Sequence, residues 1–194
     1  MNDKVTNILL VGVGGQGTLL ASEILTEVLM LAGYDVKKAE VHGMAQRGGS
    51  VVSHVRFGRK VHSAIIPEGE ADILFGFELL ETYRYLPLLG ANGKVLANDL
   101  KIMPLPVATG KERYPAGLAE KISAQVPQSR IVNGLQLAIQ AGNDRTVNTV
   151  LLGTLATLLD IDLDLWRQAI KKLVPEKFCV VNLKAFETGL TVGF

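Results

Sequence analysis

Cysteine is almost absent from this chain, because Cys179 is the only one among 194 residues. One cysteine excludes a disulfide framework, a cysteine zinc site and an iron–sulfur cluster held by this chain alone. Charge of either sign is not in excess, since the formal net charge is +1. We therefore expect no nucleic-acid partner and no anionic membrane surface. Long apolar runs are also missing, so no segment is expected to span a bilayer.

The first residues contain a short apolar run but no basic segment before it and no small-residue cleavage site. This pattern does not predict a signal peptide, and we expect a cytoplasmic protein. The length and the ordinary composition, with 48% hydrophobic and 20% charged residues, predict one domain over residues 1–194.

Glycine, in contrast, is abundant, and the 20 glycines cluster at 12–17, 43–49 and 90–93. The run VTNILLVGVG predicts a buried parallel strand, and the following residues show helical spacing up to Gly33, which is placed as a C-terminal cap. YDVKKAEV predicts a second strand. The chain therefore opens with a β-α-β unit.

After this unit, SVVSHVRF and KVHSAIIP flank Gly58-Arg59, which predicts an antiparallel hairpin over 50–67. Three more strands are expected in ADILFGF, GKVLAND and RIVN, with a helix in ELLETYRYLPLL and a surface loop or irregular strand over 103–117. The last third predicts helices, the final one beginning at Pro175 and ending at Gly189. The predicted fold is a Rossmann-like α/β domain with a mostly parallel sheet, an inserted antiparallel hairpin and a helical C-terminal third.

The motif GVGGQG places Gly12, Gly14 and Gly17 in G-x-G-x-x-G spacing, directly between a predicted strand and a predicted helix. Glycine permits the tight turn and lets backbone approach a phosphate at the helix N-terminus. Two interpretations stay open: an anion or nucleotide site, or a purely structural turn.

The second polar stretch is HGMAQRGG, residues 42–49. Arg47 before Gly48-Gly49 indicates a planar cation beside backbone that must bend or approach a ligand closely, and a phosphate is its natural target. His42 is a candidate contact to a ligand or partner. The alternative is a surface arginine in a loop.

Other patterns give weaker predictions. His42, His54 and His62 invite a metal site, but the hairpin register would turn His54 and His62 to opposite faces. Cys179 is expected to be a buried packing residue. Asp160, Asp162 and Asp164 do not match a calcium loop and are expected to include a helix N-cap.

No self-sufficient catalytic set is visible in the sequence, which is typical of a subunit. The alternative is a stand-alone NAD(P)-binding dehydrogenase. Glu40 lies near the acidic position that such a site requires, although slightly late in the sequence.

The segments NILLVGVGGQGTLLASEIL, EVHGMAQRGGSVVSHVRFG, PEGEADILFGFELLETYRYLPLL and NLKAFETG together resemble the gamma-type subunits of 2-oxoacid:ferredoxin oxidoreductases, and among them the small (beta) subunits of the indolepyruvate enzymes. The resemblance covers nearly the whole chain. It implies a complex that oxidatively decarboxylates a 2-oxoacid with coenzyme A, giving acyl-CoA and CO₂ and reducing ferredoxin.

The resemblance further implies that thiamine diphosphate and [4Fe-4S] clusters are held by a larger partner subunit, that coenzyme A approaches the interface, and that this chain is inactive alone. A homodimer is an option in isolation. No metal site is expected, and no catalytic residue is assigned. The candidate cofactor-binding residues are Gly12, Gly14, Gly15, Gln16, Gly17, Thr18, His42, Gln46, Arg47, Gly48 and Gly49. We expect the two glycine-rich loops to converge at the carboxyl ends of the strands.

Overall fold

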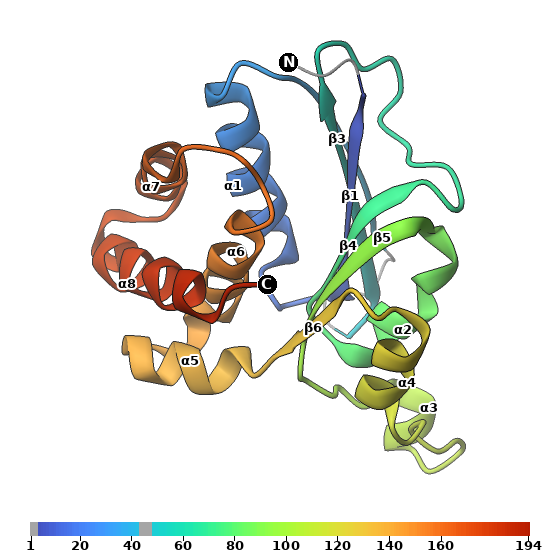
Figure 1. Ribbon diagram of the computed structural model, residues 1–194. Helices are drawn as coiled ribbons and strands as arrows, with labels where there is room; N and C mark the ends of the chain where they lie inside the picture. The colour runs from blue at the N-terminus through green and yellow to red at the C-terminus, as the bar shows by residue number, and fades with distance from the viewer. Residues whose placement is uncertain (1–3, 43–47) are drawn as a thin grey trace.

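The computed structural model describes residues 4–42 and 48–194, which form a sheet with helices on both faces (Figure 1). The strands are β1 (Thr6–Val13), β2 (Asp35–His42), β3 (Ser50–Gly58), β4 (Ala71–Gly76), β5 (Leu89–Asn98) and β6 (Ser129–Val132). The helices are α1 (Thr18–Leu31), α2 (Leu79–Arg84), α3 (Leu105–Ala108), α4 (Leu118–Gln125), α5 (Gly134–Ala141), α6 (Val147–Ala156), α7 (Leu163–Leu173) and α8 (Glu176–Val192), with short 3₁₀ turns η1 (Leu86–Leu88) and η2 (Asp144–Thr146).

Within the described residues, the sheet has six strands in the order β2-β3-β1-β4-β5-β6. All neighbouring strands are parallel except for β3, which runs antiparallel to both β1 and β2. The predicted mostly parallel sheet with an antiparallel insertion and a helical C-terminal third is therefore confirmed.

The position of the hairpin was wrong. The antiparallel pair is β2 with β3, and residues 60–66 form no strand. The reason is that β3 is already paired along both edges, so no edge is left for a third partner. Instead, the Val61 N–H donates to Asp35 at 2.9 Å and the Ile66 N–H donates to His54 Nδ1 at 3.2 Å. The parity argument that separated His54 from His62 therefore fails as well.

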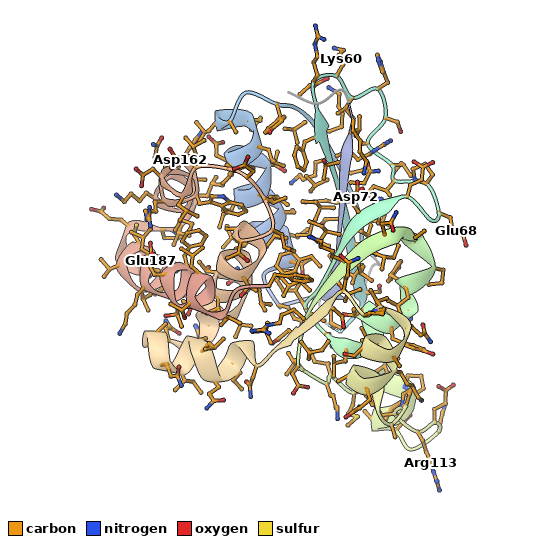
Figure 2. The ribbon with its side chains drawn as sticks, viewed as in Figure 1. Lys60, Glu68, Asp72, Arg113, Asp162 and Glu187 are labelled. Carbon is orange, nitrogen blue, oxygen red and sulfur yellow. The ribbon has the colours of Figure 1, made fainter. Side chains whose placement is uncertain are left out.

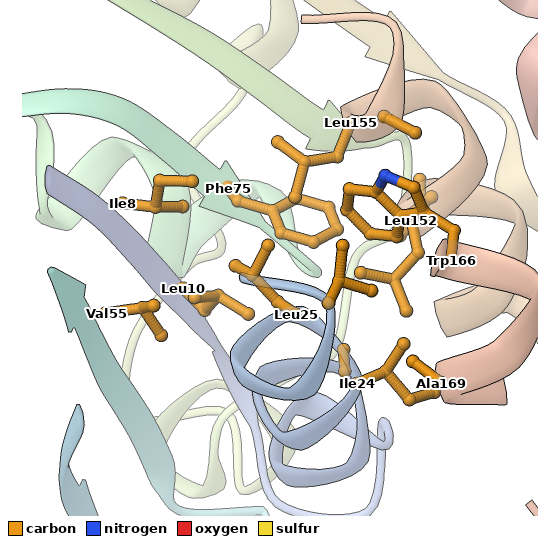
Figure 3. Packing of buried hydrophobic residues seen from close by; sticks show 14 of the residues in the cluster. Ile8, Leu10, Ile24, Leu25, Val55, Phe75, Leu152, Leu155, Trp166 and Ala169 are labelled. Carbon is orange, nitrogen blue, oxygen red and sulfur yellow. The ribbon is translucent and has the colours of Figure 1, made fainter. Parts of the chain in front are cut away.

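Alternation along the strands divides the core into two layers. In β1, Ile8 and Leu10 belong to the layer under α1, α6, α7 and α8, whereas Leu9 and Val11 face the layer under α2 and α4. Figure 3 shows the first layer, in which Leu25 of α1 and Trp166 of α7 approach Phe75 of the sheet. Because both faces are covered, the central strands β1 and β4 are apolar over most of their length.

Helix boundaries follow the expected signals in two places. Gly33 adopts a φ of 85° just after the end of α1. There the Gly33 N–H donates a hydrogen bond to the Met30 carbonyl, and the Tyr34 N–H donates one to the Leu29 carbonyl. Asp162 caps α7 by accepting a hydrogen bond from the Asp164 N–H at 2.9 Å, as predicted.

Three predictions for the C-terminal half need correction. Pro175 is the N-cap of α8 and does not lie in its first turn. Gly189 lies inside α8, which continues to Val192. A glycine is present at this position because it allows close contact with Gly153 of α6, and it does not mark the end of the helix. Cys179 is only partly buried, since it lies on the exposed first turns of α8.

Residues 103–117 were predicted as a surface loop or an irregular strand. The structure adds the short helix α3 within this stretch.

Candidate functional site

A cleft of about 610 Å³ opens at the carboxyl ends of β1, β4 and β5. From β1 the chain passes through α1 toward β2 on one side, and from β4 it passes through α2 to β5 on the other side. This reversal between neighbouring strands is the point where open α/β sheets bind ligands. The cleft is lined by Gly15, Gln16 and Gly17, by Phe77 and Asn98 at the strand ends, and by residues of η2, α5, α6 and α8.

The GVGGQG loop is held in shape by its own glutamine. Gln16 Oε1 accepts a hydrogen bond from the Val13 N–H at 2.6 Å, and Gln16 Nε2 donates to the Phe77 carbonyl at 2.9 Å. A Cβ on Gly12 would lie 2.8 Å from Gln16 Oε1, so glycine is required there for packing. Gly12 and Gln16 therefore build the turn.

Gly15 and Gly17 shape the face of the loop that borders the cleft. Gly15 has a φ of 101°, and a Cβ on it would meet no heavy atom within 4 Å. Gly17 is the N-cap of α1 with a φ of 75°, and no side chain of residues 4–42 or 48–194 caps this helix. The first N–H groups of α1 are thus available to an anion.

Thr18 is buried behind the loop, and its hydroxyl has no hydrogen-bond partner within the described part of the chain. Its Oγ1 lies 3.0 Å from the position that a Gly12 Cβ would take, so it points toward β1. Thr18 does not line the cleft.

The two glycine-rich loops meet, because the Gly14 N–H donates to the Gly49 carbonyl at 2.9 Å. Gly48 has a φ of 78° and an exposed backbone. Gln46, Arg47 and the His42 side chain lie outside the described residues.

Three asparagines that sequence reasoning missed hold the walls of the cleft together. Asn98 bonds to the Phe77 carbonyl and the Gly134 N–H at 3.3 and 3.0 Å. Asn148 donates to the Gly17 carbonyl at 3.4 Å, and Asn182 accepts from Thr149 at 2.6 Å. Asn98 could have been found, since it ends a predicted strand.

Arg145 was also missed. It lines the cleft on η2, is exposed, and has no ion-pair partner among residues 4–42 and 48–194. Among the described residues that line the cleft, the only charged one besides Arg145 is its neighbour Asp144. The rest of this lining is neutral, with amide, hydroxyl and apolar side chains that include Leu135 and Phe178.

Glu40 does not face the cleft. Its Oε1 accepts hydrogen bonds from Ser22 at 3.1 Å and Lys38 at 2.9 Å. Glu40 also belongs to β2, which β3 separates from β1. In a dinucleotide site the acidic residue lies beside the glycine loop, so this geometry does not favour the dehydrogenase alternative.

The two histidines whose side chains are described do not gather into a site. His54 is buried in β3 and His62 is exposed after β3. No group of three or more His, Cys, Asp or Glu side chains in the described ranges could hold a metal ion. No helix in these ranges is long and apolar enough to cross a membrane.

Comparison with known proteins gives consistent matches over nearly the whole length. A family model for pyruvate ferredoxin/flavodoxin oxidoreductase matches residues 7–192. Indolepyruvate oxidoreductase subunit IorB of Pyrococcus horikoshii is 40% identical, covering 96% of this chain and 95% of that protein. The subunit of the same name from Archaeoglobus fulgidus is 38% identical over 94% of this chain and 92% of its own.

Solved structures share the fold. The gamma subunit of a keto/oxoacid ferredoxin oxidoreductase from Geobacter sulfurreducens matches with a TM-score of 0.71 and 23% identity, covering 96% of each chain. A 2-oxoglutarate:ferredoxin oxidoreductase from Magnetococcus marinus, solved with 2-oxoglutarate, coenzyme A and succinyl-CoA bound, matches with a TM-score of 0.74 and 18% identity. That match covers 98% of this chain and 31% of the other.

Proposed function

The chain belongs to the pyruvate ferredoxin/flavodoxin oxidoreductase family, and on that premise we propose that it is the small subunit of a ferredoxin-linked 2-oxoacid oxidoreductase acting on indolepyruvate or related arylpyruvates. The observation that carries the proposal is the near-complete match to indolepyruvate oxidoreductase subunits, at 36–40% identity. We treat residues 1–194 as one gamma-type domain, because one sheet organises the described residues and the family model spans 7–192.

The complex would convert a 2-oxoacid and coenzyme A into acyl-CoA and CO₂, and would transfer two electrons to ferredoxin. Thiamine diphosphate and [4Fe-4S] clusters would lie on the larger subunit. The cysteine content supports this division, because a [4Fe-4S] cluster needs four thiolates and this chain has only Cys179. The chain alone would be inactive.

Within the complex, we assign the cleft to coenzyme A. The N-terminus of α1 and Arg145, neither of which has a capping or ion-pair side chain among the described residues, suit its phosphates, and the mixture of amide and apolar walls suits its amide-containing chain. Gly48 and Gly49 adjoin this loop through the Gly14 bond. The proposed binding residues remain Gly12, Gly14, Gly15, Gln16, Gly17, Thr18, His42, Gln46, Arg47, Gly48 and Gly49, with Gly12, Gln16 and Thr18 acting through the shape of the loop.

The test of the subunit assignment is purification of the tagged chain from its own cells, followed by an absorbance spectrum and assay of the product. We expect a larger partner with iron–sulfur absorbance and bound thiamine diphosphate. Ferredoxin reduction should require both chains, an arylpyruvate and coenzyme A. A colourless, solitary chain that binds a nicotinamide nucleotide would overturn the proposal.

The test of the coenzyme A assignment is steady-state kinetics of the reconstituted complex with Arg145→Ala. Removing one phosphate contact should raise KM for coenzyme A about tenfold and leave KM for the 2-oxoacid unchanged. Arg130→Ala is the matched control, because Arg130 is exposed on β6, outside the cleft. Equal KM values for coenzyme A in the two variants would show that Arg145 does not contact coenzyme A.

Arg47→Ala is assayed separately, because Arg47 is assigned from the sequence. Unchanged acyl-CoA formation together with unchanged assembly would remove Arg47 from the site.

A further inference from the structure

Residues 101–114, which we call the arm, project from the carboxyl edge of the sheet beyond α2 and α4 (Figure 1). The arm contains α3 and returns to the body before α4. Figure 2 places Arg113 at its tip, pointing away from the rest of the molecule.

One buried carboxylate fastens both ends of the arm. Glu78 is only 1% exposed, and its Oε1 accepts hydrogen bonds from the Ile102 N–H at 3.1 Å and from the Tyr114 hydroxyl at 2.6 Å. Burial, together with the hydrogen bond to Glu78, raises the pKa of Tyr114, so its hydroxyl remains a donor at neutral pH. The arm therefore has a fixed base.

The arm is also ordered within itself. The N–H groups of Val107 and Ala108 donate to the Pro104 carbonyl, and those of Lys111 and Glu112 donate to the Pro106 carbonyl, at 2.9 to 3.1 Å. Because its backbone hydrogen bonds are already formed in the free chain, the arm would lose little conformational entropy on binding a partner.

The surface of the arm combines apolar and basic side chains. Leu105 is 77% exposed and Met103 is 54% exposed. Lys101, Lys111 and Arg113 are exposed and have no ion-pair partner in the described part of the chain, and Glu112 is the only acidic residue in the segment. A surface complementary to the arm would be acidic and would have an apolar depression for Leu105.

The arm is connected to the candidate site through α2. Glu78 Oε2 accepts from the Glu81 N–H at 2.8 Å, and Glu81 Oε2 accepts from the Ser50 hydroxyl at 2.6 Å. Ser50 directly follows Gly49, which is bonded to Gly14 of the first glycine-rich loop. A partner bound to the arm would therefore lie at the same edge of the sheet as the cleft.

We propose that the arm docks this chain onto an acidic, partly apolar surface of the larger thiamine-binding subunit. This inference rests on the proposed function, because that subunit is the partner whose active site must meet the cleft.

The experiment measures the affinity of the full-length chain for the purified larger subunit at low and high salt. Lys111→Glu with Arg113→Glu should weaken binding at least tenfold at low salt, and the loss should shrink as salt screens the charges. Leu105→Asp should weaken binding by a similar factor at both salt concentrations. All these residues are exposed, so the fold of the free chain should not change.

The matched control is Lys171→Glu with Lys184→Glu, which makes the same charge change on exposed lysines of α7 and α8, across the sheet from the arm. Its affinity should stay within twofold of the wild type. Wild-type affinity in the arm variants would overturn the docking role while leaving the proposed function intact. Failure of the wild-type chain itself to bind would overturn both. Loss of self-association alone, with the heterocomplex unchanged, would assign the arm to a homodimer instead.

Discussion

The two faces of the sheet are covered in different ways. On the face under α6, α7 and α8, the contacts are mainly hydrocarbon, and the Trp166 and Phe186 rings stack with centroids 5.8 Å apart. The polar groups buried in these helices, such as Thr149 and Asn182, are neutral. On the opposite face, α2 and residues 59–70 bury ionisable groups, among them Glu78, Glu81 and His54. Each of these three accepts hydrogen bonds from backbone N–H groups or hydroxyls that belong to other segments.

This difference separates stability from function. Hydrocarbon packing is non-directional and gives most of the free energy of folding. Buried carboxylates fix particular segments in particular places, because each requires specific donors. The second face therefore positions the arm and the Gly48–Ser50 segment, whereas the first face holds the fold together.

The largest effect should come from Gly153→Ala, which breaks the first face. A Cβ on Gly153 would lie 2.9 Å from Gly189 Cα and would collide with the Phe186 carbonyl, so α6 and α8 would have to separate. We expect the free energy of unfolding to fall by about 2–3 kcal/mol, despite the better helix propensity of alanine. Urea denaturation of the free chain measures this.

Thr188→Ala is the control for that variant, because it introduces alanine on α8 beside Gly189 without entering the contact. It should change the free energy of unfolding by no more than about 0.5 kcal/mol. A Gly153→Ala chain as stable as the wild type would show that the first face does not depend on this close approach.

A smaller effect is expected where the two faces meet, at the glycine-rich loop. Gln16→Ala removes the hydrogen bonds to the Val13 N–H and the Phe77 carbonyl. The expected loss is about 1–2 kcal/mol, because both partners are left unsatisfied. Urea denaturation measures it against Gln136→Ala, a control at an exposed glutamine of α5, which should be nearly neutral. Equal stability of the two variants would mean that water replaces the two hydrogen bonds of the Gln16 side chain.

Sequence periodicity predicted the buried strands and the long helices, since their apolar spacing records burial directly. It misplaced the hairpin because the Gly58-Arg59 turn signal is local, whereas the pairing of β3 with both β1 and β2 depends on residues far apart in the chain. It also assigned Gly189 to a helix end, although a neighbouring helix explains this glycine.

The candidate site was only half predictable for the same reason. The GVGGQG loop carries a local signature, so its position at the end of β1 followed from the sequence. Arg145 and the asparagines of α6 and α8 come to the cleft through helix packing, and nothing in their local sequence records that proximity. Glu78 begins the segment predicted as the helix ELLETYRYLPLL, and its contacts with Ile102 and Tyr114 depend on residues that lie far along the chain.

The smallest effect is a pH dependence specific to the second face. Burial, with a smaller contribution from Arg56, lowers the pKa of His54 below its ordinary value of 6.5. The unfolded chain therefore binds a proton before the folded chain does, so stability is fully present above pH 6.5 and falls as the pH drops toward the folded-state pKa.

Protonation of Nδ1 would also remove the acceptor that holds the Ile66 N–H, so residues 59–70 should loosen first. Hydrogen exchange at Ile66, measured at several pH values below 6.5, would detect this, and the Gly153–Gly189 contact should be unaffected over the same interval. His54→Gln should flatten the pH dependence of stability. If His54→Gln and the wild type lost stability in parallel on acidification, the titrating group would have to be elsewhere. In that case Glu78 and Glu81, and not His54, would be the buried groups that hold the segments of the second face in place.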